Sequence, residues 1–474
     1  MTIVKKSVLN RTWDEFPMNR LLGEQPFHCF SGLFPVYWLA HRSLGQMLHN
    51  RKDSVDKFIV RGGKKLKGTV TISGAKNAAL ALMPATLLAS GKYRFDNMPE
   101  LRDITTMGKL LQTMGVDIEK NSHSFSLNTF RVNKFEAPYE HVKKMRASIY
   151  VLGPLIARYG YAKVSLPGGC AWGPRPVNFH IEGIRQLGAQ VDIDRGYIIA
   201  KAKRLKAAKI TFGVSSVGAT GNVMMAAVLA RGTTVIQNAA MEPEIVALAE
   251  FLTKMGARIH GIGTHRLEIE GVDALHPSDE AMIPDRIEAG TMLVAAAITG
   301  GRVKIEKCKP NHLTTVIKKI KECGASIQLG DDWIKITAPK HIKPVDVTTE
   351  IYPGFPTDMQ AQWIALMSIA RGTSVITDEI YFDRFKHVPE LVRLGANIDI
   401  QKNVAVVKGV KKLRGAKVMS TDLRASASLV LAGLITDGTT EILRVYHLDR
   451  GYERIEKKLH LLGADIRRAS GQEF

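Results

Sequence analysis

The sequence predicts a two-domain α/β protein in which each domain holds three copies of a unit of about 70 residues. Three observations lead to this prediction. A short glycine-containing phrase recurs six times, a second glycine precedes each copy, and a strongly apolar helix precedes each second glycine. The chain of 474 residues is also too long for a single hydrophobic core.

The recurring phrase comes at the end of a predicted amphipathic helix. Its copies are "LLQTMGVDI", "IRQLGAQVDI", "FLTKMGARI", "IKECGASI", "LVRLGANIDI" and "LHLLGADI". Their glycines are 68 to 73 residues apart and are Gly115, Gly188, Gly256, Gly324, Gly395 and Gly463. Such regular spacing indicates internal repetition of one structural unit.

The second marker is a glycine that follows an apolar helix and precedes a β-prone run. Glycine at this place suits the C-terminal end of a helix. These glycines stand 23 to 28 residues before those of the phrase and are Gly91, Gly160, Gly232, Gly300, Gly372 and Gly438. One unit is therefore predicted to run helix, strand, helix, strand.

The two helices of a unit differ in character. The first is apolar on nearly all sides, as in "NAALALMPATLLAS", so it must be buried. The second is amphipathic, as in "PEIVALAEFLTKMG". We therefore expect buried helices in the middle of each domain, sheets around them, and a ligand site in the cleft between the two domains.

Composition excludes several classes of protein. The chain is 45% hydrophobic and 23% charged, and it has no apolar run long enough to cross a membrane. Its net charge of +21 is spread along the chain without a basic block, which argues against nucleic-acid binding and allows an enzyme that attracts anions. Its four cysteines, Cys29, Cys170, Cys308 and Cys323, lack metal-ligand spacing and suggest a reducing compartment.

Residues 1–55 lack the helix pattern and are predicted to be an extension outside the fold.

The starts of the buried helices carry polar residues that suit anion binding. Helix N-termini attract anions, and parallel buried helices would gather theirs at one end of a domain. The candidates are Lys76, Asn77, Arg146, Asp358, Asp422 and Arg424. Simpler readings stay open: either aspartate could act only as a helix N-cap, the arginines could pair with acids, and Lys76 could be solvated.

Several phrases together resemble the UDP-N-acetylglucosamine 1-carboxyvinyltransferase family of enolpyruvyl transferases. They are "SGAKNAALALMPA", "MRASIYVLGPLIARYG", "LPGGCAWGPRPVNFHIEG", "SVGAT", "FPTDMQAQ", "DRFKHVPEL", "TDLRASASLVLAG" and "HLDRGYERIE". The resemblance covers about residues 57–467 and implies a two-domain inverse (inside-out) α/β barrel of six repeats. It implies a first domain of residues 56–75 plus 285–474, and a second domain of residues 76–284.

The reaction that the resemblance implies is transfer of an enolpyruvyl group from phosphoenolpyruvate to the 3′-hydroxyl of UDP-N-acetylglucosamine, with release of phosphate and without a cofactor or metal. The resemblance places Cys170 as the proton donor, on a loop that closes over the substrates, and as the thiol that fosfomycin alkylates. A thiol with a pKa of about 8.5 is mostly protonated near neutral pH, and Arg175 should lower that pKa. Cys308 and Cys323 fit the pattern of small buried hydrophobic residues.

The resemblance also assigns the other site residues. Asp358 is the candidate base or orienting group for the sugar hydroxyl, Lys76 is catalytic, and Asp422 belongs to the same surroundings. The phosphoenolpyruvate set is Lys76, Asn77, Arg175, Arg424 and Arg450. The UDP-N-acetylglucosamine set is Arg146, Arg175, Pro176, Val177, Asn178, Phe179, Ser216, Val217, Gly218, Asp358 and Ile380. His180 lies at the edge of that set and is either part of it or a loop histidine without a role.

Two departures from the family pattern concern the UDP contacts. Asn178 stands where some members carry Asp, and Val214 stands where some carry Lys. The alternative acceptor is that of 5-enolpyruvylshikimate-3-phosphate synthase, against which the "PGGCAWGPRPV" stretch argues. A paralogue with altered activity and a nucleic-acid-binding scaffold are weaker alternatives. We expect a cytoplasmic monomer of peptidoglycan synthesis, with small-molecule substrates and neither nucleic acid nor membrane as partner.

Overall fold

The computed structural model describes residues 54–143, 145–167 and 177–472, which lie in one compact unit that begins at Ser54. Within these residues, 24 strands form six four-stranded sheets, and the apolar side chains form two separate cores. One core is built from residues 75–282, called here the central lobe. The other is built from residues 58–72 and 287–466, called the terminal lobe. Cys170, Arg175 and Pro176 lie outside the described residues.

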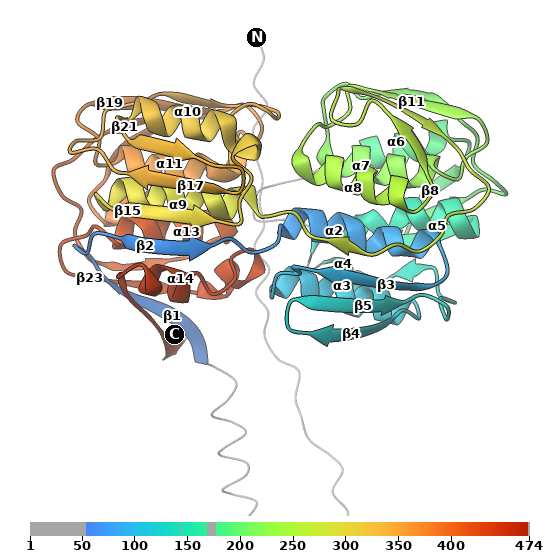
Figure 1. Cartoon of the computed structure of the whole chain (residues 1–474), viewed down its shortest axis with the longest axis horizontal. Helices are drawn as coiled ribbons and strands as arrows, with labels where there is room; N and C mark the ends of the chain where they lie inside the picture. The colour runs from blue at the N-terminus through green and yellow to red at the C-terminus, as the bar shows by residue number, and fades with distance from the viewer. Residues whose placement is uncertain (1–53, 144, 168–176, 473–474) are drawn as a thin grey trace, which may run out of the picture. The chain divides into compact units, whose positions relative to one another are not determined.

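In the central lobe, three sheets surround helices α2, α5 and α7 (Figure 1). Its helices are α2 (Lys76–Ala85), η1 (Thr86–Leu88), α3 (Arg102–Thr113), α4 (Tyr139–Val142), η2 (Arg146–Val151), α5 (Leu152–Tyr159), α6 (Asn178–Gln186), α7 (Val217–Ala227) and α8 (Pro243–Lys254). Its strands are β3 (Lys92–Asp96), β4 (Asp117–Asn121), β5 (Ser124–Asn128), β6 (Glu136–Ala137), β7 (Tyr161–Ser165), β8 (Gln190–Asp194), β9 (Tyr197–Lys201), β10 (Lys209–Thr211), β11 (Thr233–Gln237), β12 (Arg258–His260), β13 (Arg266–Glu270) and β14 (Glu280–Ala281).

The terminal lobe repeats this arrangement around α9, α11 and α13. Its helices are α9 (Arg286–Ile298), η3 (Pro310–Leu313), α10 (Thr314–Glu322), η4 (Thr357–Met359), α11 (Gln360–Met367), α12 (Val388–Arg393), α13 (Leu423–Gly433), η5 (Val445–Arg450) and α14 (Ile455–Leu461). Its strands are β1 (Ser54–Arg61), β2 (Lys67–Thr71), β15 (Arg302–Glu306), β16 (Ser326–Leu329), β17 (Trp333–Thr337), β18 (Val347–Thr349), β19 (Thr373–Asp378), β20 (Asn397–Gln401), β21 (Val404–Lys408), β22 (Lys417–Met419), β23 (Thr439–Leu443) and β24 (Asp465–Gln472).

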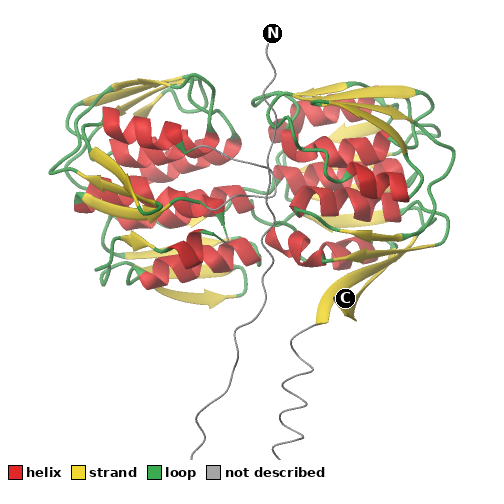
Figure 2. Cartoon of the chain, turned by 180° about the vertical axis from the view of Figure 1, so that it is seen from behind, coloured by secondary structure: helices red, strands yellow, loops and turns green. Residues whose placement is uncertain are grey.

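The prediction of buried helices inside and sheets outside is confirmed. Figure 2 shows the helices of each lobe enclosed by the yellow strands. All eight residues of α11 are buried, and α9 is buried throughout except for Arg286. A helix can be apolar on every side only where other elements cover every side, so these segments form the centre of each core.

The predicted order of elements within a unit is incomplete. The amphipathic helix is followed by a hairpin of two strands rather than by one strand, as in β4–β5 and β8–β9. A short further strand then pairs in parallel with the next unit, as β6 does with β7. The hairpins escaped prediction because their first strands carry mostly polar residues; β4 reads "DIEKN".

Each lobe closes on itself through a strand from elsewhere in the chain. In the central lobe β14 pairs in parallel with β3, which joins the third unit to the first. In the terminal lobe β2 pairs in parallel with β15, and β1 lies between β23 and β24. The segment that precedes the repeats therefore supplies two strands to the terminal lobe.

The six phrase glycines all have the backbone conformation that the repeat requires. Each has a positive φ between 89° and 102°. At Gly115 the glycine N–H donates to the Gln112 carbonyl, and the next N–H, of Val116, donates to the Leu111 carbonyl. This pair of bonds is the Schellman motif, which ends a helix at a left-handed residue. The same two bonds recur at the other five glycines.

The upstream glycines agree less uniformly with the prediction. Gly160 is the left-handed C-cap of α5, and Gly300 follows the C-cap of α9. By contrast, α2 ends at Ala85, and a 3₁₀ turn, η1, fills most of the space before Gly91. Gly91 has a φ of 156°, and a Cβ there would clash with the Pro277 ring. This glycine therefore serves the close approach of Pro277 rather than a helix cap.

Among the described residues, no helix is long and apolar enough to cross a membrane.

Candidate active site

Three polar residues predicted at helix starts, and Arg450 from the predicted phosphoenolpyruvate set, come together from four segments. Lys76 is the first residue of α2, and Asp358 lies in η4, directly before α11. Arg424 is in the first turn of α13, and Arg450 is the last residue of η5. Three of these segments belong to the terminal lobe and one to the central lobe, so the site is assembled from both.

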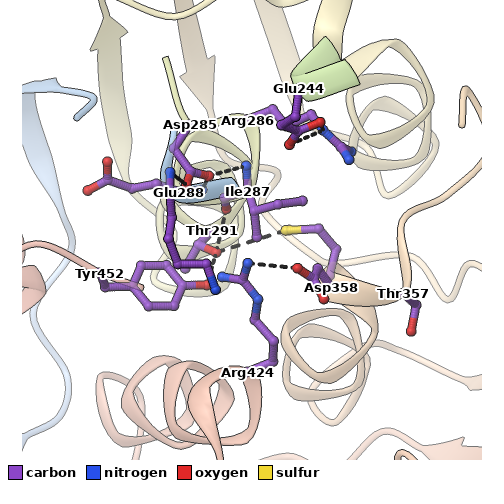
Figure 3. Close-up of polar contacts among 12 residues, drawn as sticks. Glu244, Asp285, Arg286, Ile287, Glu288, Thr291, Thr357, Asp358, Arg424 and Tyr452 are labelled. Atoms are coloured by element: carbon purple, nitrogen blue, oxygen red, sulfur yellow. Dashed lines mark hydrogen bonds and ion pairs between the residues drawn. The ribbon is translucent and has the colours of Figure 1, made fainter. Parts of the chain in front are cut away.

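Asp358 is held between two arginines. Arg424 Nη2 donates to Oδ2 at 2.7 Å, and Arg384 Nη2 donates to Oδ1 at 2.8 Å (Figure 3 draws the first). Burial by itself would raise the pKa of Asp358, but Arg424, Arg384 and Lys76 together hold that pKa well below its usual range. Asp358 is therefore a carboxylate at neutral pH. It is not a helix N-cap, because no backbone N–H is bonded to its side chain within the described residues.

Arg424 is buried, with 3% of its surface exposed. Its guanidinium lies 5.3 Å from the centre of the Tyr452 ring. Its Nη1 has no hydrogen-bond partner among the described residues. Burial opposes the charge, but Asp358 raises the pKa of Arg424 above its ordinary value. The site thus contains a buried guanidinium with donor capacity left for an anion.

Uncharged side chains form a hydrogen-bond network that holds the Tyr452 ring beside Arg424. The Tyr452 hydroxyl lies 2.9 Å from the Thr291 hydroxyl, and Gln362 Nε2 donates to the Tyr452 oxygen at 3.0 Å. Gln362 also donates to the Asp358 carbonyl at 3.0 Å. Thr291 of α9 and Gln362 of α11 thereby fix the aromatic ring beside Arg424, and Gln362 also fixes the backbone of Asp358. Figure 3 draws the contact between Thr291 and Tyr452.

Asp103 links two further cations. Arg450 Nε donates to Asp103 Oδ1 at 2.9 Å, and Lys76 Nζ lies 3.8 Å from Asp103 Oδ2. Burial lowers the pKa of Lys76 most, and the neighbouring Arg424 lowers it further, whereas Asp103 and Asp358 raise it; the net direction is downward. Asp103 comes from α3 of the central lobe and Arg450 from the terminal lobe, so this ion pair joins the lobes.

The N-terminus of α9 contributes Asp285 and Arg286. Asp285 caps α9 by accepting from the backbone N–H groups of Ile287 and Glu288, and it also accepts from the Lys76 N–H at 3.3 Å. Arg286 Nε donates to Glu244 of α8 at 3.2 Å, which gives a second ion pair between the lobes (Figure 3). This helix start was not among the predicted site residues.

Asp378 organises the segment that carries Ile380. Its buried carboxylate accepts from the hydroxyls of Thr349 and Thr357 at 2.7 and 2.8 Å, and from the Ile380 N–H at 3.0 Å. Arg384 Nη1 in turn donates to the Thr357 hydroxyl at 2.9 Å. Ile380 is therefore connected through Asp378 and Thr357 to the same arginine that holds Asp358.

Two of the residues predicted to contact the UDP-sugar, Arg146 and Gly218, lie near His180. This histidine is in α6, not in a loop, and is 5% exposed. Its Nδ1 lies 2.9 Å from Asn222 Nδ2, and burial together with nearby Arg146 lowers its pKa to about 3. A Cβ on Gly218 would lie 3.1 Å from its ring. His180 is thus neutral and buried.

The other predicted residues have the following places. Val177 is buried directly before α6, Asn178 is exposed at the start of α6, and Phe179 packs with its ring 6.0 Å from that of Phe212. Ser216 caps α7, which begins with Val217 and Gly218. Asn77 is half-buried in α2, and Val214 is 60% exposed.

Two simpler readings of the sequence are confirmed. Asp422 caps α13 by accepting from the N–H groups of Arg424 and Ala425. Cys308 and Cys323 are buried thiols whose pKa values burial raises to about 11 and about 12. Among the described residues, no group of three or more His, Cys, Asp or Glu could hold a metal ion.

Sequence reasoning missed Asp103, Asp285, Arg286 and Arg384. Arg384 lies within the quoted phrase "DRFKHVPEL", which was a usable signal. Asp103 gave no signal, because an aspartate in the first turn of a helix is common without any function. Its contacts with Arg450, which is 347 residues away, and with Lys76 distinguish it.

Comparison with known proteins agrees with this architecture. A model of the EPSP synthase (3-phosphoshikimate 1-carboxyvinyltransferase) family matches residues 60–459. The enolpyruvyl transferase NikO from Streptomyces tendae has a TM-score of 0.80 at 25% identity, covering 88% of this chain and 100% of that one. An EPSP synthase from Acinetobacter baumannii, at 20% identity and a TM-score of 0.67, covers 88% of this chain and 100% of that one and shares the fold. The predicted inside-out α/β fold is confirmed.

Curated relatives are considerably more similar. The UDP-N-acetylglucosamine 1-carboxyvinyltransferase of Chloroherpeton thalassium is 59% identical over 423 residues, which are 89% of this chain and 99% of that protein. The protein of the same name from Geotalea daltonii is 55% identical over 414 residues, 87% of this chain and 99% of that protein. This chain therefore belongs to the EPSP synthase family and, within it, to the UDP-N-acetylglucosamine 1-carboxyvinyltransferases.

Proposed function

We propose that the chain transfers the enolpyruvyl group of phosphoenolpyruvate to the 3′-hydroxyl of UDP-N-acetylglucosamine and releases phosphate. The observation that carries this choice is the 59% identity over 423 residues to a UDP-N-acetylglucosamine 1-carboxyvinyltransferase. The geometry supports it, because a carboxylate and several cations from both lobes meet at one place. The product would enter peptidoglycan synthesis in the cytoplasm.

Phosphoenolpyruvate is the proposed ligand of the cationic group. It carries a carboxylate and a phosphate, for which arginine forks and a lysine are suitable partners. Arg424 has the free donor Nη1 described above, and Arg450 and Lys76 share the single carboxylate of Asp103. We assign Lys76, Asn77, Arg424 and Arg450 to this ligand, together with Arg175, which lies outside the described residues.

Asp358 is proposed to orient the sugar hydroxyl and to accept its proton. A carboxylate paired with two arginines is a weak base, since both arginines stabilise its charge. An anionic substrate would engage the same guanidinium groups and reduce their hold on Asp358. The base would then become stronger when phosphoenolpyruvate is bound, which is the moment when the hydroxyl must attack.

Cys170 is the proposed general acid on the other side of the double bond. The CH₂ carbon of phosphoenolpyruvate takes a proton and becomes a methyl group while the sugar oxygen bonds to the neighbouring carbon. Loss of phosphate together with a proton from that methyl group then restores the alkene. A thiol beside a cation such as Arg175 can give its proton near neutral pH. The same thiol would be the target of fosfomycin.

The UDP-sugar is proposed to lie beside His180. The set comprises Arg146, Arg175, Pro176, Val177, Asn178, Phe179, Ser216, Val217, Gly218, Asp358 and Ile380. The start of α7 at Val217 suits the diphosphate, because the free N–H groups of a helix N-terminus attract anions. We further propose that residues 56–75 with 285–474, and residues 76–284, act as the two domains of a monomer.

Release of phosphate tests this function. Phosphate should appear from phosphoenolpyruvate only when UDP-N-acetylglucosamine is present, and shikimate 3-phosphate should not replace it. Cys170→Ala should abolish turnover and prevent covalent labelling by fosfomycin, measured as an increase in protein mass, whereas the buried Cys308→Ala should retain both turnover and labelling. Turnover with shikimate 3-phosphate would favour the alternative acceptor, and full activity of Cys170→Ala would exclude its role as the acid.

A further inference from the structure

Two short segments, residues 72–76 and 282–286, join the lobes and run antiparallel to each other. Gly74 and Pro284 form a bridge, the Ala75 N–H donates to the Ile283 carbonyl at 2.7 Å, and the Asp285 N–H donates to the Ser73 carbonyl at 2.9 Å. Lys76 begins α2 directly after the first segment, and its N–H bonds to Asp285. The place of Lys76 therefore depends on how this crossing is anchored.

A buried ion pair anchors the first segment to the terminal lobe. Glu288, in the first turn of α9, accepts from the Ser73 N–H at 2.8 Å. Lys458 of α14 donates to the Ser73 hydroxyl at 2.7 Å and forms an ion pair with Glu288. We call Ser73, Glu288 and Lys458 the Ser73 clasp. Figure 3 shows Glu288 beside Asp285 on α9.

Stability alone does not explain this pair. Glu288 is 2% exposed, and burial raises its pKa although Lys458 lowers it. Apolar residues of similar volume commonly replace a buried ion pair without loss of stability, whereas charged groups with several bonds fix one arrangement of their neighbours. Both charged groups here bond to the same residue, Ser73, three positions before Lys76.

We propose that Glu288 and Lys458 are positioning residues for Lys76, which they act on through Ser73. They anchor the segment that carries Lys76 to the lobe that carries Asp358, Arg424 and Arg450. This inference rests on the proposed function in one respect, the assignment of Lys76 to phosphoenolpyruvate. Without the clasp, α2 still folds within the central lobe, but Lys76 loses its fixed place relative to the cations of the terminal lobe.

The test uses the full chain with Lys458→Met, which keeps an unbranched side chain one atom shorter and removes the ammonium group that bonds to Ser73 and Glu288. Lys458→Arg keeps donors for Ser73 and Glu288, and Lys457→Met is the matched control, because Lys457 is exposed on the same helix. A small displacement of a substrate-positioning group can cost about tenfold to a hundredfold. The KM for phosphoenolpyruvate should rise by that factor in Lys458→Met and recover in Lys458→Arg.

Three results decide the question. The KM for UDP-N-acetylglucosamine should change little, because Lys76 does not belong to its set. A merely structural pair would change both KM values together or only the melting temperature, and this outcome would overturn the proposal. If Lys458→Met does not fold, Ser73→Ala removes only the hydroxyl partner and should give a smaller rise in the same KM.

Amide hydrogen exchange separates the clasp from the proposed function. If the wild type fails to release phosphate with UDP-N-acetylglucosamine, the function is wrong, but the clasp remains testable. The N–H groups of Ser73, Ala75 and Lys76 should exchange faster in Lys458→Met than in Lys457→Met. Equal exchange in these two variants would exclude the clasp whatever the reaction.

Discussion

Replacement of Asp358 by Asn removes one charge at the centre of the site and changes little in shape. The carboxylate accepts from Arg424 and Arg384 through different oxygens. An amide keeps one acceptor oxygen and turns its NH₂ group toward the other arginine. The variant therefore separates the effect of charge from the effect of volume.

The structure sets the expected loss of stability. Removing one partner of a buried ion pair costs about 3–5 kcal/mol. Arg424 has 4% of its side chain exposed, which fits that range, but Asp358 has 29% exposed and Asn can still serve one arginine. We therefore expect about 3 kcal/mol, which is about a hundredfold in the unfolding equilibrium. Loss of a general base lowers kcat by a further, separate factor of about 10²–10⁴.

The difference in stability should depend on pH in a defined direction. The pKa of Asp358 in the folded chain lies well below 3.8. A depressed carboxyl pKa stabilises the fold above the unfolded pKa of about 3.9, and this contribution is lost as the pH falls through the folded pKa. Urea unfolding should show the full difference between wild type and variant near neutral pH and a shrinking difference below about pH 4.

Asp383→Asn is the matched control, since Asp383 is exposed and directly precedes Arg384. It should change neither stability nor kcat. The reasoning about Asp358 fails if Asp358→Asn is as stable as this control at neutral pH. It also fails if the difference in stability grows as the pH is lowered toward 3.

Three further predictions concern single residues. Arg450→Lys should raise the KM for phosphoenolpyruvate about tenfold in initial-rate assays, because lysine cannot reproduce the planar fork of donors. The folded pKa of His180 is lowered to about 3, so protonation of the unfolded chain below about pH 6.5 costs stability; His180→Gln should flatten the fall of the melting temperature between these pH values. Gly463→Ala should lower the free energy of unfolding by about 1–2 kcal/mol, because Gly463 has a φ of 98° although space for a Cβ is open. The control Gly213→Ala, with equally open space and no such φ, should leave thermal unfolding nearly unchanged.

The architecture was predictable because each repeat contains residue types whose local conformation or burial can be inferred from the sequence. Gly115 and its five counterparts each end a helix in a left-handed conformation, which few other residues tolerate. The apolar helices could be recognised as buried from composition alone. The hairpins could not, because strands such as β4 have one polar, solvent-facing side and lack a clear alternation. The pairing of β1 and β2 with distant strands could not be predicted either, because no local sequence pattern indicates which strand is the partner.

The candidate site was predictable in part for a similar reason. Helix starts can be read from sequence, so Lys76, Asp358 and Arg424 were found. Their partners depend on contacts between distant segments, and Asp103 and Arg384 were therefore missed. Capping was also ambiguous from sequence: Asp422 and Asp358 both follow Thr before a helix, yet the first caps α13 and the second pairs with two arginines.

The six buried helices begin with different polar residues. In each unit the polar residue stands at the start of the buried helix or in the turn that leads into it. Lys76 starts the first unit, Arg146 the second, Ser216 the third, Arg286 the fourth, Asp358 the fifth and Arg424 the sixth.

The fourth start differs from the others in its partners. Arg286 pairs with Glu244 of the central lobe, and its neighbour Asp285 bonds to the backbone of Lys76. The fourth unit thus uses its helix start to join the lobes, whereas the fifth and sixth present Asp358 and Arg424 to each other. The clasp residue Glu288 lies on the same turn of α9 as Arg286. The ion pair between the lobes and the proposed placement of Lys76 therefore both depend on the N-terminus of α9. A chain with identical units could repeat the fold, but it could not supply a carboxylate, several cations and an anchor at equivalent positions.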